Sequence, residues 1–292
     1  MNRAEALELF HSDDLIEIGM RADEVRRRHH PEGVVSYIID RDLNCLQDQE
    51  VVFEQIQETI DLGGTGIVMK GGPEPSLKIE WYEDLLRNIK ARFEIHSQGF
   101  FAPEIVNIAG VSGLSLSDTL SRLRDAGLDS LAGGCADTQD WANVHRTAHA
   151  LGMRTTATML FGYGESLEQR IDHLERVRQI QEETGGFTAF IPWSFQREDN
   201  THGHFAKEEA TAVEFLKTLA ISRIYLDKIA NIQSSWVTPG LKTCQVGLRF
   251  GGNDVGSTMV GRATEEELRH IIRDAGFVPK QRDTLYSQYF LN

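Results

Sequence analysis

The sequence predicts an α/β fold, a TIM-type (β/α) barrel with an N-terminal helical extension, on the basis of three observations. Apolar β-branched runs alternate with helical patterns at intervals of roughly 30 residues, which is typical of parallel strands joined by right-handed crossovers. The run at 33–39 is almost continuously apolar, as expected for a strand covered on both faces. The 292 residues are enough for one barrel of about 250 residues.

The predicted elements follow in order along the chain. Two helices occupy 4–30, so we assign 1–32 to a helical extension and 33–292 to one barrel domain with a C-terminal tail. Strands are predicted at 33–39, 65–69, 94–99, 129–131, 154–161, 188–193, 231–237 and 245–250. Helices are predicted at 49–62, 79–93, 117–126, 141–151, 166–184, 207–221 and 264–276. Two pairs have the spacing of a capping box: Ser166 with Gln169, and Thr264 with Glu267.

Composition and charge exclude several classes of partner. The formal net charge is −14 and no basic patch interrupts it, which argues against nucleic acid or an anionic membrane as a partner. No stretch approaches the roughly 18 apolar residues of a membrane span. The three cysteines are odd in number and far apart, as in a reducing compartment. We therefore expect a soluble cytoplasmic protein with a small-molecule ligand, and the oligomeric state stays open.

The loops that follow the strands of such a barrel share one face, and this face carries function. Here they supply polar and aromatic side chains suited to a planar, hydrogen-bonding ligand such as a nucleoside. The candidate ligand-binding residues are Lys70, Gly71, Gly72, Gln98, Glu104, Tyr163, Trp193, Gln233, Trp236, Asn253 and Arg249. Among them Lys70 and Arg249 are candidates for holding anionic groups. The candidates for proton transfer are the carboxyl groups Glu165, Asp137 and Asp254.

No metal site is predicted from the residues alone. Cys45 is the only cysteine near the end of the first strand, and the strand predicted at 245–250 puts Cys244 at the opposite end of the barrel. His145 and His149 are four residues apart but lack a third ligand, so we expect them on a helix surface.

Several stretches, in order along the chain, resemble the cyclic dehypoxanthinyl futalosine synthase family. They include HPEGVVSYIIDRDLN (30–44), RTTATMLFG (154–162), ETGGFTAFIPWSFQ (183–196), NIQSSWVT (231–238) and GFVPKQRDTLY (276–286). The resemblance implies a barrel of the radical S-adenosylmethionine (SAM) superfamily and a place in the futalosine route of menaquinone biosynthesis. It also implies SAM and a [4Fe–4S] cluster, held by a Cys-x3-Cys-x2-Cys loop after the first strand.

The chain departs from the family at these very positions. The sequence passes from Asn44 to the next helix with Cys45 alone, so the iron–sulfur motif is missing and we predict no cofactor from the residues. The family's QGG is Lys70-Gly71-Gly72 here, and a family histidine is Gln98. The family's GGGAE is GGCAD, which places Cys135 and Asp137, and its Gly-His is Gly162-Tyr163.

Three interpretations follow. In the first, the barrel has lost the [4Fe–4S] loop and binds a nucleoside-like or other small polar or aromatic ligand at its mouth. It then either carries out acid/base chemistry without a cofactor or acts as a binding protein. In the second, the protein is a genuine radical SAM synthase of menaquinone biosynthesis, and the 292 residues lack some of its loops. In the third, it is a non-catalytic partner of an active homologue, recognisable by an exposed apolar patch on the outer helices. The sequence favours the first.

Overall fold

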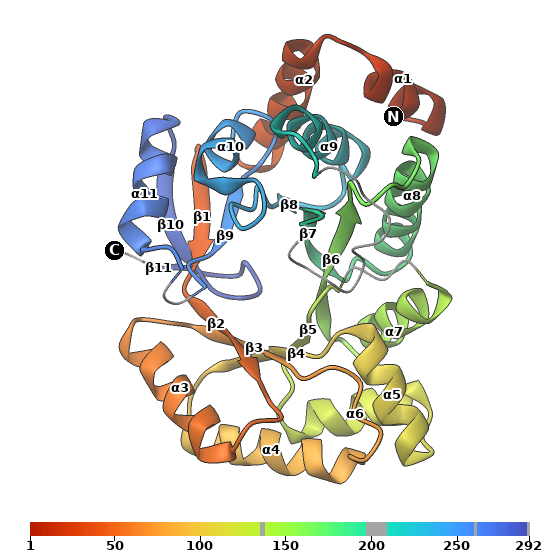
Figure 1. Ribbon diagram of the computed structural model, residues 1–292, viewed down its shortest axis with the longest axis vertical. Coiled ribbons are helices and arrows are strands. Elements are labelled where there is room, and N and C mark those ends of the chain that lie inside the picture. Colours follow the sequence, from red (N-terminus) through yellow and green to blue (C-terminus); the bar gives the residue numbers. More distant parts are fainter. Residues whose placement is uncertain (135–137, 197–208, 260–261, 291–292) are drawn as a thin grey trace.

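The computed structural model describes residues 1–134, 138–196, 209–259 and 262–290. Parallel strands surround the centre of the molecule and helices form an outer ring, so the predicted α/β barrel of TIM type is confirmed (Figure 1). The strands are β1 Val34–Ile38, β2 Asp40–Asn44, β3 Gly66–Lys70, β4 His96–Gly99, β5 Ser130–Leu131, β6 Arg154–Phe161, β7 Phe187–Ser194, β8 Asn231–Ile232, β9 Asp254–Ser257, β10 Val278–Arg282 and β11 Tyr289–Phe290.

The helices fill the connections between these strands, as a βα repeat requires. Two helices precede the first strand and lie at the top of Figure 1. The helices are α1 Arg3–His11, α2 Leu15–His29, α3 Gln49–Asp61, α4 Ile79–Arg92, α5 Ala102–Ser112, α6 Leu116–Ala126, α7 Gln139–Ala150, α8 Leu167–Thr184, α9 Ala212–Tyr225, α10 Gly240–Gly247 and α11 Glu265–Asp274. None of the helices in the described part of the chain has the length and apolar character that a membrane span requires.

The first strand of the barrel changes partners halfway along its length. Its first part, β1, pairs with β9 and β10, whereas β2 pairs with β3 in a seven-stranded parallel sheet ordered β2-β3-β4-β5-β6-β7-β8. The change occurs at Ile39, whose carbonyl oxygen accepts a hydrogen bond from the Thr65 amide at 3.0 Å. The ring closes where Gln233, just after β8, forms a bridge with Asp254 of β9.

Alternation along the strands separates two environments. On β6, Ala157, Met159 and Phe161 are buried in the apolar layer between strands and helices, so Thr158 and Leu160 face the centre of the barrel. A second, smaller apolar cluster lies beneath α11 and includes Val35, Tyr37, Val255 and Leu268. Because these side chains of β1 and β9 face outward, the alternate residues, such as Ser36 and Asp254, face the centre of the barrel.

The sequence prediction was wrong at the seventh and eighth strands. Residues 245–250, predicted as a strand, contain the end of helix α10, and the strand β9 begins later, at Asp254. Polar and apolar residues alternate in QVGLRF, which mimics a half-buried strand. The strand predicted at 231–237 is also shorter, since β8 ends at Ile232.

Helix α5 was not predicted. It begins after Phe101, with Pro103 near its start, and buries Ile105 and Ile108 at a helical spacing. The other predicted helices are found close to their expected bounds, except that α9 begins at Ala212 and runs to Tyr225, and the predicted start at 207 lies outside the described residues. Both expected capping boxes form, from Ser166 with Gln169 at the start of α8 and from Thr264 with Glu267 at the start of α11.

Candidate functional site at the mouth of the barrel

Strand β2 presents two carboxylates to the centre of the barrel. Its sequence is DRDLN, in which only Leu43 is apolar. Leu43 is fully buried in the layer beneath the helices, and Arg41 pairs with Glu58 of α3 at 2.7 Å, so both face outward. The alternate residues Asp40 and Asp42 therefore face inward.

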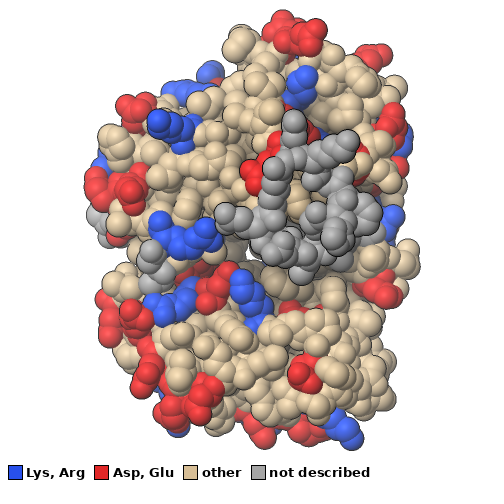
Figure 2. Space-filling model, in the orientation of Figure 1, with Lys and Arg blue, Asp and Glu red and all other residues tan. Residues whose placement is uncertain are grey.

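Lys70, at the end of β3, lies beside the second of these carboxylates. Its Nζ is 2.6 Å from Oδ2 of Asp42, and both side chains are partly exposed. The predicted role of Lys70 in holding an anionic group therefore competes with an ion pair inside the protein. Figure 2 shows a hollow near the centre of this face, bordered by acidic and basic side chains.

The opposite side of the centre is apolar. Leu160 of β6 pairs in register with Trp193 of β7, and Ile191 lies two residues before Trp193 on the same face. All three side chains are only partly buried. Since β6 and β7 lie across the barrel from β2 and β3 (Figure 1), a ligand between them meets charged groups on one side and an aromatic wall on the other.

The predicted residues Gly71, Gly72 and Glu104 come together, but they bind one another. Oε1 of Glu104 accepts hydrogen bonds from the amides of Gly71 and Gly72, both at 2.9 Å. Oε2 accepts one from the Phe101 amide at 2.7 Å, at the start of α5. The buried carboxylate thus ties the turn after β3 to helix α5, which follows β4, and reaches back to the N-cap amide as the third residue of a capping box does.

Glu165 has the same kind of role in the turn after β6. Its carboxylate accepts hydrogen bonds from the amides of Gly162 at 2.8 Å and Tyr163 at 3.0 Å. It also pairs with Arg170 of α8, and both side chains are 3% exposed. This arrangement favours a structural role, and proton transfer by Glu165 stays a prediction.

Arg249 does not lie in a strand, and Asn253 and Asp254 do not lie in a loop after one, because the strand predicted at 245–250 begins within helix α10, which ends at Gly247. Asp254 belongs to β9 and is fully buried, with Nε of Arg282 at 2.6 Å and Oγ of Ser36 at 2.6 Å. Asn253 precedes β9 and accepts hydrogen bonds from the buried Arg223 at 2.6 Å and from a backbone amide. Arg249 is exposed on the outside, over the ring of Phe277.

The remaining predicted residues are distributed around the interior. Gln98 is buried and donates to the Leu131 carbonyl at 3.3 Å. Gln233 is buried at the closure of the ring, and Nε1 of Trp236 donates to the Ser257 carbonyl at 2.8 Å. Asp137 and Cys135 lie outside the described residues.

Sequence reasoning did not single out Asp40 and Ser257. The hydroxyl of Ser257, on β9, donates to Oδ1 of Asp40 and accepts from the Met259 amide at 2.7 Å. Burial raises the pKa of Asp40 to about 6. The signal in DRDLN is the spacing of its two carboxylates, because residues two apart share one face of a strand and Leu43, the one apolar residue, marks the opposite face.

The described cysteines do not form a cluster site. Cys45 is buried at the mouth, its amide donating to the Lys70 carbonyl at 2.9 Å, and burial raises the pKa of its thiol to about 12. Cys244, placed before a strand by the sequence prediction, lies instead in α10, where Sγ donates to the Ser234 carbonyl. The two belong to separate apolar clusters, so they do not converge on one metal. Thiolate ligation of a [4Fe–4S] cluster does not fit these residues.

The histidine pair was also misplaced by sequence reasoning. His145 is buried between α7 and β6, where Nδ1 lies 2.9 Å from the Thr155 hydroxyl, and burial lowers its pKa to about 3. His149 is 2.8 Å from the same hydroxyl. Across the parts of the chain that the structure describes, no three histidine, cysteine or acidic side chains gather into a metal site.

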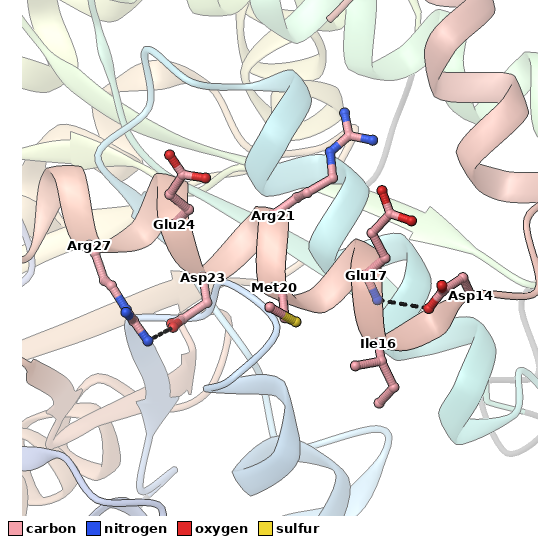
Figure 3. Close-up of a pocket in the computed structure, with 8 residues that line it drawn as sticks. All are labelled: Asp14, Ile16, Glu17, Met20, Arg21, Asp23, Glu24 and Arg27. Atoms are coloured by element: carbon pink, nitrogen blue, oxygen red, sulfur yellow. Dashed lines mark hydrogen bonds and ion pairs between the residues drawn. The ribbon is translucent and has the colours of Figure 1, made fainter.

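Hollows elsewhere on the surface do not bear on this site. One lies along the outside of α2, where Ile16 and Met20 are exposed among charged side chains (Figure 3). Another lies at the other end of the barrel, where Thr65 and His96 lie at the starts of β3 and β4. Neither is lined by a residue predicted for ligand binding.

This chain is similar to known proteins along almost its whole length. Residues 184–291 match the family described as the CofH/MqnC C-terminal region. A cyclic dehypoxanthine futalosine synthase of Halalkalibacterium halodurans is 37% identical, covering 98% of this chain and 90% of that protein. One of Streptomyces coelicolor is 35% identical, covering 97% and 84%. The crystal structure of methylornithine synthase (PylB) has the same fold, with a TM-score of 0.70, 17% identity and 95% and 94% coverage.

The alignment with the Halalkalibacterium protein also shows a difference in length. It spans 337 positions, more than the 292 residues of this chain. That relative therefore has internal segments that this chain lacks, in agreement with the short passage from Asn44 to the next helix.

Replacing Asp254 by alanine tests whether this carboxylate is structural. We expect a loss of about 3–5 kcal/mol in the free energy of unfolding, because the guanidinium of Arg282 is left buried without its partner. Denaturation in urea measures this loss. The matched control is Asp42→Ala, which breaks a partly exposed pair and should cost no more than about 1 kcal/mol. Equal, small losses in both variants would show that Asp254 does not hold the fold.

Alkylation of the thiols tests the burial of Cys45 and Cys244. Because burial raises both thiol pKa values, the thiolate is scarce at pH 8, and we expect labelling at least about a hundredfold slower than in urea. Mass spectrometry of the tryptic peptides Asp42–Lys70 and Thr243–Arg249 reads each site separately. Rapid labelling of Cys45 in the folded protein would show that the mouth is open at this residue.

Proposed function

We propose that this chain, which belongs to the cyclic dehypoxanthine futalosine synthase family of radical SAM enzymes, forms the barrel of a synthase that binds a futalosine-class nucleoside at its mouth. The observation that carries the proposal is the two-sided interior. Asp40, Asp42 and Lys70 provide hydrogen-bonding groups on one wall, and Leu160 and Trp193 provide an apolar wall opposite. Sites for small organic ligands combine an apolar lining with a few placed polar groups in this way.

The comparisons favour the synthase interpretation over the cluster-free one that the sequence favoured. The two relatives named above are synthases, and their similarity covers 98% and 97% of this chain rather than one half of it. The interpretation as a non-catalytic partner has less support. The exposed apolar residues Ile16 and Met20 lie among charged side chains and do not make an extended patch (Figure 3). A cytoplasmic location stays a prediction.

The reaction requires ligands that the 292 residues do not contain. A [4Fe–4S] cluster with bound SAM supplies radical chemistry in this family, and the described thiols cannot hold one. We propose that the active synthase carries its cysteine-bearing segment between β2 and α3. The residues of this chain then bind and orient the nucleoside.

The connection between β2 and α3 is suited to such an insertion. Only Cys45–Asp48 separate the strand from the helix. The Asn44 side chain accepts from the Leu46 amide at 3.1 Å, and the Asp48 side chain accepts from the Glu50 amide at 2.9 Å. The cap of α3 lies at the far end of the connection and the Asn44 contact lies at its start, so additional residues directly after Asn44 replace one local contact and leave the start of α3 undisturbed.

Peptide mapping of the protein from its natural source tests the insertion directly. Trypsin releases Asp42–Lys70 from the 292-residue chain, because no lysine or arginine lies between these ends. We expect this peptide to be replaced by longer sequence containing additional cysteines. Detection of the unmodified peptide would show that the loop is naturally absent, and would support the cluster-free barrel instead.

Grafting the corresponding loop of the Halalkalibacterium relative between Asn44 and Cys45 tests the synthase proposal itself. After anaerobic reconstitution, we expect about four iron atoms per grafted chain, the visible absorbance of thiolate-bound iron, and formation of the cyclic product. The ungrafted chain should bind no stoichiometric iron.

A graft with its three cysteines replaced by serine is the matched control, because it keeps the length of the loop but removes the thiolates. The proposal fails if the grafted chain folds and holds its cluster but forms no product. It also fails if the serine control is equally active.

A further inference from the structure

Asp40 differs from the other carboxylates around the barrel because it has hydrogen-bond acceptor positions that no described residue occupies. Glu104 and Glu165 each accept several hydrogen bonds from turns or arginine, and Asp254 is paired with Arg282. At Asp40, Oδ1 accepts the Ser257 hydroxyl, and no donor to Oδ2 is found among the residues that the structure describes. The side chain is only partly buried. An ionised carboxylate has about four acceptor positions, so most of those on Asp40 are open.

Ser257 fixes the direction in which the carboxylate points. Its oxygen already accepts from the Met259 amide at 2.7 Å, so its own proton is left to donate to Asp40. Pairing of Ile38 with Ser257 in adjacent strands holds the two side chains at the junction of β1, β2 and β9. Both groups therefore sit on the framework and not on a loop, which limits their movement.

We propose that Asp40, positioned by Ser257, accepts a hydrogen bond from a sugar hydroxyl of the ligand bound in the barrel. This inference rests on the proposed function for the class of ligand, a nucleoside. Carboxylates are well suited to ribose hydroxyls because they only accept, whereas a hydroxyl can donate.

The opposite wall determines the orientation of the ligand. Trp193 and Leu160 offer a flat apolar surface across the barrel from β2. A nucleoside-class ligand would place its ring against this surface and its sugar toward Asp40 and Ser257. The Asp42–Lys70 pair lies on the same wall as Asp40.

The charges around Asp40 set the pH range of the interaction. The groups that act on it are Asp42 on β2, Asp254 and Ser257 on β9 and Arg282 on β10, while Lys70 on β3 pairs with Asp42. Burial dominates and raises its pKa to about 6, so the carboxylate is ionised above this pH and protonated below it. Affinity for the hydroxyl should therefore fall as the pH is lowered through 6, by about tenfold between pH 7.5 and pH 5.

Calorimetric titration of the 292-residue chain with adenosine and its 2′-, 3′- and 5′-deoxy analogues tests the inference. We expect Asp40→Asn to weaken adenosine binding about tenfold to a hundredfold, since the charged acceptor is lost. The deoxy analogue that lacks the bonded hydroxyl should bind Asp40→Asn and the unaltered protein equally. Ser257→Ala should show the same selectivity with a smaller loss, because Asp40 loses its orientation.

Asp61→Asn, an exposed residue of α3 with the same change of charge, is the matched control and should bind all four compounds as the unaltered protein does. The inference is overturned if Asp40→Asn weakens all four compounds equally, if it weakens none, or if the unaltered protein binds none of them. These measurements need no iron. Failure of the loop graft with intact hydroxyl selectivity would refute the synthase proposal alone, and the reverse result would refute the role of Asp40 alone.

Discussion

Closure of the barrel depends on one buried carboxylate, that of Asp254. A parallel barrel is complete only when its last strand pairs with its first. The Asp254 side chain accepts hydrogen bonds from Ser36 of β1 at 2.6 Å and from Arg282 of β10 at 2.6 Å. Its backbone carbonyl accepts from the Ser234 amide, beyond β8, at 2.8 Å. One residue therefore joins the two ends of the seven-stranded sheet through the strands that lie between them.

The other acidic side chains around the mouth hold the loops in shape. Glu104 links the turn after β3 to α5, and Glu165 links the turn after β6 to α8. Glycine-rich turns leave unpaired amides, and a buried carboxylate is an efficient way to satisfy two or three of them. As a result the mouth contains many carboxylates but few that are free to meet a ligand. Asp40 belongs to this smaller group because its neighbour on β9 is a hydroxyl and not a guanidinium.

The fold was predictable because hydrophobic periodicity is a local property. Runs such as 154–161 have the same period in any surroundings, and the capping boxes of α8 and α11 depend on residues three apart. Prediction failed in QVGLRF, because its apolar residues are spaced in a way that is compatible both with a strand and with the last turn of α10. The site was less predictable. Whether a carboxylate is free depends on partners far away in sequence, such as Arg282 for Asp254, and no local pattern reveals them.

The short connection from β2 to α3 has a consequence for how catalytic function and fold are inherited. Its ends are closed by Asn44 and Asp48, and the buried Cys45 continues the pairing with β3, so the scaffold is complete without any catalytic segment. Selection on folding and selection on reactivity then act on separate stretches of the gene. A short deletion or insertion there would remove or restore the cluster-binding segment, and with it the radical reaction. The sequence identity over the whole chain would hardly change. Classification of such chains by whole-length similarity will group active enzymes with inactive relatives.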